Sequence, residues 1–365
     1  MKIACINYQP VSLYRDQGWS IERLGNYYNP TGVANEVLVA AYEEKTAFDF
    51  PQNVHVEGYL TQSDLNKIVV DFKPDVIRCY EANYPFCLMA LNLARQMNVP
   101  SYLSLHDSRK RHVRQLADYT VITAYTETVQ RMAKARTGKD VELQLNGIDS
   151  KFFDPTIVSE DDVKLTKLRL GIKDCDFLIY TIGRDDPLVN IPVQCKAVDL
   201  FRKVSGVDAQ FVISGPGFED GRLNDLGFVH AIGKTTQADI RAIHSISNCF
   251  MQVRIVPEIS MAVTEALMMG VPVIHASGDE TEKRLRWPIG ITVDDPSDPY
   301  MIADHLEFLW RNLDEAKAAS KNRRNMTVST YDEEMWRKWE ADRYRRLYEK
   351  SIEWKRLNER VPHGN

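Results

Sequence analysis

The tract from Arg254 to Ile274 combines residue types that bind phosphate and sugar hydroxyls. Glu258 and Glu265 lie around the start of an expected helix, Gly270 ends that helix, and an apolar strand follows. A helix N-terminus carries unpaired N–H groups and a partial positive charge, which stabilise a bound phosphate. A nearby carboxylate accepts hydrogen bonds from hydroxyl groups. The tract therefore indicates a site for a nucleotide sugar.

Polar or glycine-rich residues follow three other expected strands. In an open parallel sheet, ligands bind beyond the carboxyl ends of the strands, so these positions favour function. They are His106-Asp107 after Ser101–Leu105, Gly183-Arg184 after Phe177–Ile182, and Gly215-Pro-Gly217 after Gln210–Ser214.

His106 and Arg184 also have structural interpretations. His106, which precedes an aspartate, could be a structural histidine at a strand end whose hydrogen bonds are satisfied by its neighbours. Arg184 could pair with Asp185 or Asp186 in a surface arrangement that contributes little stability, although a guanidinium also suits a diphosphate. Both alternatives stay open at this stage.

Several other chemical signatures fail on spacing. The run from Gly215 to Gly221 is one residue too long for a dinucleotide loop, so it predicts a tight turn. Gly227 lies one position too far from Gly233-Lys-Thr for an ATPase loop. Neither a convincing metal-ligand spacing nor a G-x-S-x-G elbow is present, which disfavours metalloenzymes and serine hydrolases.

Short apolar runs alternate with helical patterns along the chain, which predicts α/β domains with parallel sheets wrapped by crossovers. A charged stretch at 158–167 suggests the join between two such domains, near residues 155–170. The expected strands are 2–8, 75–80, 101–105, 119–123, 142–145, 177–182, 210–214, 229–232, 249–253 and 272–275; the expected helices are 32–44, 86–97, 192–203, 238–246, 301–323 and 332–360.

Length and composition agree with two domains in one chain. The 365 residues exceed the usual size of one core, and a net charge of −5 gives no global basic surface for nucleic acid. The six cysteines form no C-x-x-C pair, which favours buried thiols in a reducing compartment. Without a signal peptide or an apolar run of ~18–20 residues, we expect a cytoplasmic protein.

Taken in order, these fragments resemble the GT-B fold glycosyltransferases, specifically the retaining family 4 (glycosyl transferases group 1). The segment Glu265-Ala-Leu-Met-Met-Gly270-Val-Pro-Val-Ile is the most specific match. The others are Gly32-Val-Ala-Asn-Glu, read as a glycine-rich loop opening the first helix, His106-Asp107, Asn146-Gly-Ile-Asp149 with Phe153 and Pro155, Gly183-Arg184, and Gly215-Pro-Gly217.

The resemblance implies two Rossmann-like, doubly wound domains facing a cleft. Residues 1–155 would form the N-terminal, acceptor-side domain and 165–325 the nucleotide-sugar-binding domain. Residues 326–365 would form a C-terminal helix that crosses back to the N-terminal domain. No metal or other cofactor is expected, because GT-B enzymes need no bound metal for the leaving group.

The resemblance also implies roles for particular residues. His106 and Glu258 would be catalytic, and Asp107, Arg109, Lys110 and Asn146 would lie on the acceptor side. The donor-binding residues would be Gly32, Gly183, Arg184, Ser260, Met261, Ala262 and Glu265.

Two departures from the family pattern bear on activity. Val189 stands where the family has a lysine that stabilises the leaving diphosphate, and Lys196 or Lys234 is the hypothetical replacement. Glu258 precedes Glu265 by seven residues rather than eight, so an ungapped alignment puts Pro257 at the first glutamate.

Two basic segments have competing interpretations. In the C-terminal helix, Trp336, Trp339, Arg343 and Leu347 repeat at helical spacing, which favours a packing stripe over a membrane or nucleic-acid surface. The cluster at 109–114 is either a solvated helix face or a surface for an anionic acceptor or acidic lipid, which would allow peripheral membrane contact.

The resemblance therefore implies a metal-independent, retaining glycosyltransferase. It would move a sugar from a nucleotide-diphosphate sugar to a glycan, a lipid-linked group or another hydroxyl acceptor, with no nucleic acid as partner. The alternatives are a catalytically silent GT-B protein that binds a nucleotide or glycan or supports a partner, and a nucleotide-sugar epimerase. A phosphorylase lacks support, because no motif nominates its Schiff-base lysine.

Overall fold

The computed structural model describes residues 1–16, 19–80, 84–106, 114–144, 147–256, 260–285 and 287–359. The chain divides into two compact units, and the first contains both chain ends. Unit 1 is Met1–Gly147 with Glu334–Asn365, and unit 2 is Ile148–Glu333. The first crossing between units therefore lies at 147–148 rather than at 155–170. The charged stretch expected at the join is instead helix α6 (Glu160–Leu170) of unit 2, with a capping box between Ser159 and Asp162.

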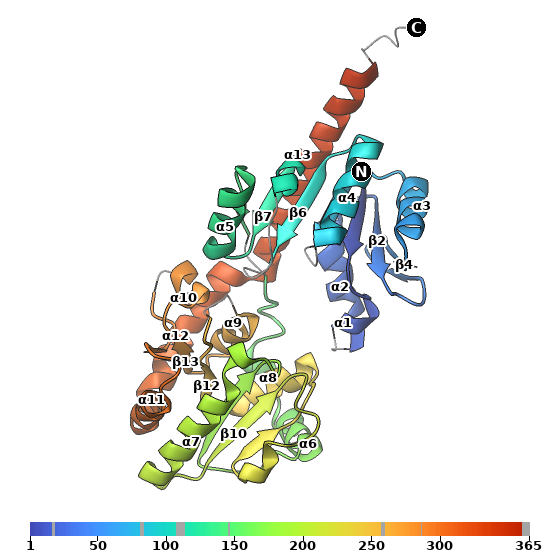
Figure 1. Ribbon diagram of the computed structural model, residues 1–365. Coiled ribbons are helices and arrows are strands. Elements are labelled where there is room, and N and C mark those ends of the chain that lie inside the picture. The colour runs from blue at the N-terminus through green and yellow to red at the C-terminus, as the bar shows by residue number, and fades with distance from the viewer. Residues whose placement is uncertain are drawn as a thin grey trace. The chain divides into compact units, whose positions relative to one another are not determined.

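Within the described residues, unit 1 contains an eight-stranded sheet in the order β3-β4-β2-β1-β5-β6-β7-β8 (Figure 1). All neighbouring pairs are parallel except β3 with β4. The strands are β1 Lys2–Asn7, β2 Glu36–Tyr42, β3 Phe48–Phe50, β4 Val54–Tyr59, β5 Val76–Tyr80, β6 Ser101–Leu105, β7 Val121–Ala124 and β8 Glu142–Leu143. The helices are α1 Ser12–Asp16, α2 Ile21–Tyr28, α3 Gln62–Phe72, α4 Tyr84–Met97 and α5 Glu127–Thr137, with 3-10 turns Pro30–Gly32 and Arg114–Asp118.

The expected helix over residues 32–44 is wrong. Residues Glu36–Tyr42 form β2, which lies between β1 and β4 and is buried on both faces from Val37 to Ala41. A strand covered on both sides has a continuous apolar run, which periodicity alone does not distinguish from a buried helix. Gly32 consequently ends a 3-10 turn instead of opening a helix.

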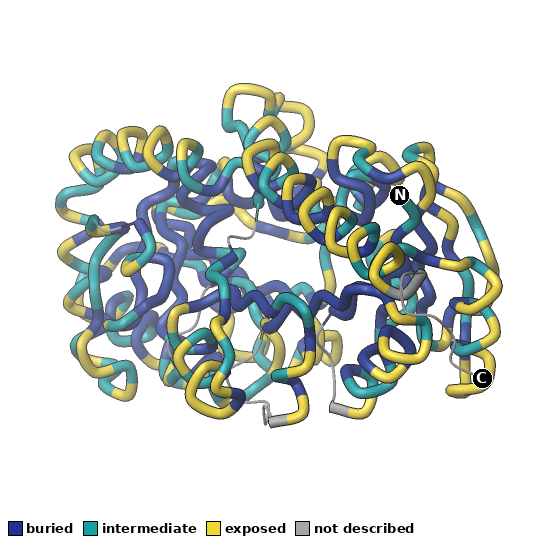
Figure 2. Tube along the Cα trace, turned by 90° about the horizontal axis from the view of Figure 1, so that it is seen from above, coloured by how far each residue is buried: buried dark blue, intermediate teal, exposed yellow. Residues whose placement is uncertain are grey.

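Unit 2 has a six-stranded parallel sheet in the described part of the chain, in the order β11-β10-β9-β12-β13-β14. Figure 2 shows the interior of the chain mostly in dark blue and the outer faces of the helices in yellow. The strands are β9 Phe177–Ile182, β10 Ala209–Ser214, β11 Val229–Ala231, β12 Cys249–Gln252, β13 Val273–Ala276 and β14 Ile291–Val293.

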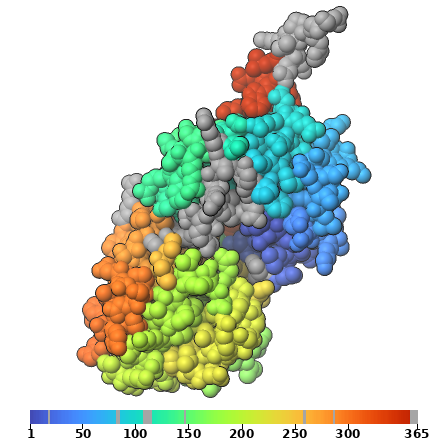
Figure 3. Space-filling model, viewed as in Figure 1, coloured from blue at the N-terminus to red at the C-terminus, as the bar shows by residue number. Residues whose placement is uncertain are grey.

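The helices of unit 2 pack around its sheet. Helices α7 and α11 pack side by side, and Figure 3 shows their surfaces in yellow-green and orange. The helices are α6 Glu160–Leu170, α7 Ile191–Ser205, α8 Gln237–Ile246, α9 Met261–Met268, α10 Glu280–Leu285, α11 Pro299–Arg311 and α12 Leu313–Tyr331, with 3-10 turns Pro155–Ile157, Pro187–Val189 and Asn224–Leu226. None of the helices described is long and apolar enough to span a membrane.

The last helix, α13 (Glu333–Glu359), packs onto unit 1, which confirms the packing interpretation of its aromatic stripe. Trp336 is buried and stacks on Tyr27, with ring centroids 5.4 Å apart, and Leu347 is also buried. Arg343, a member of the predicted stripe, is buried too, and so is Glu340, which was expected to be solvated. The six cysteines are free, and all but Cys175 are buried, as predicted.

A buried ionic cluster joins α13 to the sheet of unit 1. Arg78 of β5 contacts Glu340 at 2.5 Å, and both side chains are fully buried. Arg343 contacts the same carboxylate at 2.7 Å and also Glu142 at 2.7 Å. Burial opposes the charge of Arg78, but Glu340 and the surrounding tyrosines more than offset it, so the pKa of Arg78 lies well above its usual range.

Further hydrogen bonds link this cluster to its neighbours, although among the described residues the Nε atoms of Arg78 and Arg343 are buried without a hydrogen-bond partner. Arg78 donates to the Tyr344 hydroxyl at 2.8 Å and to Ser104 at 3.1 Å. The hydroxyl of Tyr102 donates to Glu340 at 3.1 Å, and the same hydroxyl accepts from Arg343 at 3.0 Å. Because its members have several partners each, removing one charge leaves others buried and unpaired.

We expect Arg343→Gln to lower the free energy of unfolding by about 3 kcal/mol, because it leaves the buried Glu340 with one cation fewer. Arg345→Gln is the matched control on the same helix, since Arg345 forms an exposed pair with Asp342, and its cost should stay below about 1 kcal/mol. Urea unfolding of the full chain measures both. Equal losses in the two variants would contradict the role given to the buried cluster.

Candidate functional site

Three loops meet at the carboxyl ends of β9, β10 and β11 in unit 2. The Gly183 amide donates to Ser214 O at 2.9 Å, and the Asp185 amide donates to Pro216 O at 3.0 Å. The Gly215 amide in turn donates to Gly233 O at 2.7 Å. Backbone bonds therefore hold the three loops as one surface at the edge where parallel sheets bind ligands.

Glycine is required where these loops approach each other. Gly215 has φ of 137°, and a Cβ on it would lie 1.8 Å from the carbonyl oxygen of Gly183. A Cβ on Gly217 would lie 2.6 Å from the Cβ of Asp185. The predicted tight turn at 215–217 is confirmed, and its glycines allow the turn to pack directly on the Gly183 loop.

Arg184 extends from this surface into solvent. Among the residues that the structure describes, none forms an ion pair with it. Asp185 pairs instead with Arg222, and Asp186 accepts a hydrogen bond from the Leu188 amide at 2.9 Å. The structure therefore does not contain the alternative considered for Arg184, an ion pair with Asp185 or Asp186.

Val189 points into the core instead of towards this surface. It is 4% exposed, and a Cβ on Gly183 would lie 2.5 Å from its Cγ1 atom. The next residue, Asn190, is buried with φ of 66°, and its side-chain amide donates to Val253 O at 3.2 Å. The turn is thus built around an apolar side chain at the position where the resemblance implies a lysine.

The two lysines considered as replacements lie in different places. Lys196 on α7 has its ammonium 5.8 Å from the centre of the Tyr300 ring of α11. Lys234 is exposed and follows Gly233, whose carbonyl accepts from Gly215. Lys234 is therefore the lysine at the loop surface that carries Arg184.

The predicted helix after the fourth strand of the sheet is confirmed as α9. Ser260 caps it, because the Ser260 hydroxyl accepts from the Val263 amide at 3.4 Å. The helix ends before Gly270, which has φ of 70° and leads into β13. By helix geometry, the amides of Met261 and Ala262 have no acceptor within the helix and point out of its N-terminus.

Glu265 lies on α9 and is 8% exposed. Its carboxylate is close enough to Tyr180 of β9 to act on that phenol: burial raises the pKa of Tyr180, and Glu265 raises it further. The Tyr180 hydroxyl lies 2.8 Å from the Ser214 hydroxyl at the end of β10. Sequence reasoning missed Tyr180 and Ser214, whose only signal was their place near the ends of expected strands.

His244 forms part of the packing behind this polar pair. Its ring lies 5.0 Å from that of Tyr180 and 5.2 Å from that of Phe250, measured between centroids. Complete burial lowers the pKa of His244 to about 3, so the imidazole stays neutral at physiological pH. His244 therefore acts as an apolar packing residue here.

The other predicted site residues fall in unit 1 or outside the described residues. His106 directly follows β6, is exposed, and has its ring 3.9 Å from that of Tyr125. Gly32 precedes β2, whose first residue pairs with Lys2, so Gly32 lies at the edge of the sheet where β1 and β2 begin. His106 lies at the opposite edge, where β6 ends. Five predicted residues lie outside the described part of the chain: Asp107, Arg109, Lys110, Asn146 and Glu258.

Contrary to the expectation from the sequence, Gly32 does not open a helix, because it ends the 3-10 turn Pro30–Gly32. It is exposed, with nothing within 4 Å of a Cβ built on it, and it lies at the amino ends of the strands, opposite their carboxyl ends.

Among the described residues, no group of three or more histidines, cysteines or carboxylates is arranged to hold a metal ion.

Comparison with known proteins agrees with this arrangement. Residues 164–326 match the model of the family "Glycosyl transferases group 1". No curated protein matches the chain in sequence. Solved structures match over nearly the whole chain, and their low sequence identities support a conclusion about the fold alone.

Three of these structures illustrate the likeness. HepE of Anabaena, solved with UDP and glucose, is 13% identical with a TM-score of 0.74, covering 94% of this chain and 99% of its own. A glycosyltransferase from Rickettsia africae is 12% identical with a TM-score of 0.73, covering 95% and 98%. Sucrose-phosphate synthase from Thermosynechococcus elongatus is 14% identical with a TM-score of 0.69, covering 96% and 100%.

The resemblance found in the sequence is thereby confirmed at the level of the fold and of unit 2. The protein has the GT-B fold, and its second unit matches the group 1 glycosyl transferases.

Proposed function

We propose that the protein is a retaining glycosyltransferase that uses a nucleoside-diphosphate sugar and needs no metal. The observation that carries this proposal is the exposed Arg184 on a glycine-built surface, in the same unit as the capped start of α9 and the buried Glu265. That unit matches the sugar transferases of group 1. HepE, which has the same fold, is described in complex with UDP and with UDP-glucose.

In this proposal the donor binds along the carboxyl edge of unit 2. The Arg184 guanidinium contacts the diphosphate, and the amides of Met261 and Ala262 at the start of α9 add a second, uncharged set of donors. Glu265 accepts hydrogen bonds from the ribose hydroxyls. The negatively charged diphosphate thus meets a cation and a helix N-terminus, and the ribose hydroxyls meet a carboxylate.

The reaction then depends on stabilising the leaving diphosphate. The bond between the sugar carbon and the phosphate oxygen breaks, and its electron pair leaves on the phosphate. The acceptor oxygen forms its bond on the same face of the sugar, and its proton passes to the phosphate. Arg184 and the helix amides stabilise the growing negative charge, and His106 contacts the donor sugar near the reacting carbon.

A catalytically silent, nucleotide-binding protein is the second candidate. The burial of Val189 favours it, because the turn after β9 supplies no lysine to the leaving group. In the transferase proposal, Lys234 supplies the missing cation to the diphosphate. If the Lys234 side chain stays in solvent, one charge of the leaving diphosphate is less well stabilised. Nucleotide binding without turnover over a panel of nucleotide sugars would support the silent protein.

We expect Arg184→Ala to lower kcat/KM for transfer about 100-fold or more, because it removes the charged contact to the diphosphate. Lys234→Ala should lower it less, and Lys196→Ala, whose side chain lies over Tyr300, serves as the control and should leave it unchanged. Initial rates of nucleotide release with each donor measure this. A loss in Lys196→Ala as large as in Arg184→Ala would contradict the assignment.

Val189→Lys should destabilise the protein instead of restoring a cation. The new ammonium would start from a buried position beneath Gly183, so we expect a loss of more than about 2 kcal/mol of unfolding free energy. Leu188→Lys, one residue earlier and half-buried, should cost less. If Val189→Lys is fully stable and transfers faster, the side chain reaches the donor and the buried placement is wrong.

Transfer should persist in excess EDTA, because Arg184 and the helix amides, rather than a metal ion, stabilise the leaving group in this proposal. The rate with EDTA should equal the rate without it, and added Mg²⁺ should not raise it. A rate that falls with EDTA and returns with Mg²⁺ would refute metal independence while leaving sugar transfer intact.

A further inference from the structure

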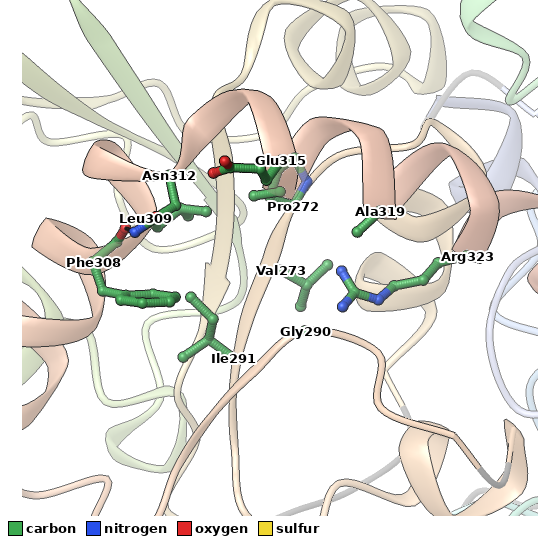
Figure 4. Close-up of a pocket in the computed structure, with 11 residues that line it drawn as sticks. Pro272, Val273, Gly290, Ile291, Phe308, Leu309, Asn312, Glu315, Ala319 and Arg323 are labelled. Carbon is green, nitrogen blue, oxygen red and sulfur yellow. Dashed lines mark hydrogen bonds between the residues drawn. The ribbon is translucent and has the colours of Figure 1, made fainter.

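A cavity of about 290 Å³ lies in unit 2 at the amino ends of β13 and β14. Arg184 and the start of α9 belong to the opposite, carboxyl ends of the same sheet. Its lining includes Val273, Ile291, Phe308, Glu315, Ala319 and Arg323 (Figure 4).

Most of the wall is apolar. Val273 and Ile291 come from the two strands, and Phe308 comes from α11 and lies beside Ile291 in Figure 4. Phe308 is 60% exposed, which is unusual for a phenylalanine on a helix that packs against its neighbours. An apolar ligand seated in the cavity would cover this ring.

Arg323 of α12 supplies the cation of the cavity. Its Nε donates to Pro288 O at 3.1 Å, and its guanidinium lies by Val273 and Gly290 in Figure 4. Burial lowers the pKa of Arg323, and within the described chain no carboxylate pairs with it. The next residue, Arg324, differs in that it pairs with Asp154 at 3.0 Å.

A partly buried guanidinium that pairs with no carboxylate keeps N–H donors that another anion can use. Glu315 lies towards the other end of the cavity, beside Asn312 and Pro272. The Asn312 side-chain amide already donates to Phe308 O at 2.7 Å, so it is committed to its own helix. An anion is therefore favoured only at the Arg323 end, and apolar groups fill the space between.

We propose that this cavity binds a small amphiphilic carboxylate, with its carboxylate on Arg323 and its apolar tail along Val273, Ile291 and Phe308. A planar carboxylate matches the remaining N–H groups of one guanidinium, whereas a phosphate dianion calls for donors that these walls lack. The volume lies near the lower limit of small-ligand sites, which fits a short tail.

This site is independent of the proposed transfer reaction, because it uses other residues at the other end of the sheet. Its test is a binding measurement on the full chain without any donor sugar. Sodium octanoate is the probe, titrated by calorimetry, with 1-octanol as the uncharged analogue and sodium acetate and inorganic phosphate as anions without a tail.

We expect octanoate to bind with one saturable site, and octanol, acetate and phosphate to bind at least about tenfold more weakly. Arg323→Gln should weaken octanoate about tenfold or more and leave octanol unchanged. Lys321→Gln removes an exposed positive charge two residues earlier on the same helix and should have no effect. Ala319→Leu adds apolar volume inside the cavity and should abolish octanoate binding. Its unfolding temperature should be equal to that of the wild type or higher, which shows that the variant is folded.

Several results would overturn the proposal. One is the absence of octanoate binding to the folded wild-type chain. Equal binding of octanol would mean an apolar pocket only, and phosphate or acetate binding as tightly as octanoate would mean an anion site only. A loss in Lys321→Gln equal to that in Arg323→Gln would mean general attraction to the helix, and unchanged binding in Ala319→Leu would place octanoate elsewhere.

Discussion

The buried contact of Arg78 with Glu340 ties the C-terminal helix to the sheet of unit 1. The two residues are far apart in sequence, and both charges are removed from water, so neither is stable there without the other. Arg343, Tyr102 and Tyr344 are further partners of this pair. The C-terminal helix is thereby held in unit 1, and unit 2 is a continuous insertion between residues 147 and 334.

In unit 2 the corresponding constraint is the contact between two glycine loops. Gly215 packs on Gly183 so closely that any side chain at 215 would meet the backbone, and the bonds at Ser214 and Pro216 fix the Gly183 loop above it. This rigid base presents Arg184. The same packing places Val189 beneath Gly183, so the features that present one cation also exclude a second from position 189.

Much of the fold followed from local patterns. The strands that lead to His106, Arg184 and α9 were predicted within about one or two residues, because each is a short apolar run with polar residues at its carboxyl end. The end of α9 was also predicted, since Gly270 is a local stop signal, whereas its cap at Ser260 was found only in the structure. The strand Glu36–Tyr42 was not, because burial on both faces removes the alternation that separates a strand from a helix.

The sequence by itself determined the α/β alternation, the presence of a glycine-rich edge with Arg184, and the helix that carries Glu265. Only the tertiary structure decided that Val189 is a core residue, that Glu340 is buried beside Arg343, and that Arg323 lines a cavity. The physical reason is the range of the contacts involved. Caps and apolar periods act over a few residues, whereas Arg78 meets Tyr344 across 266 positions, and such partners are set by how the elements pack.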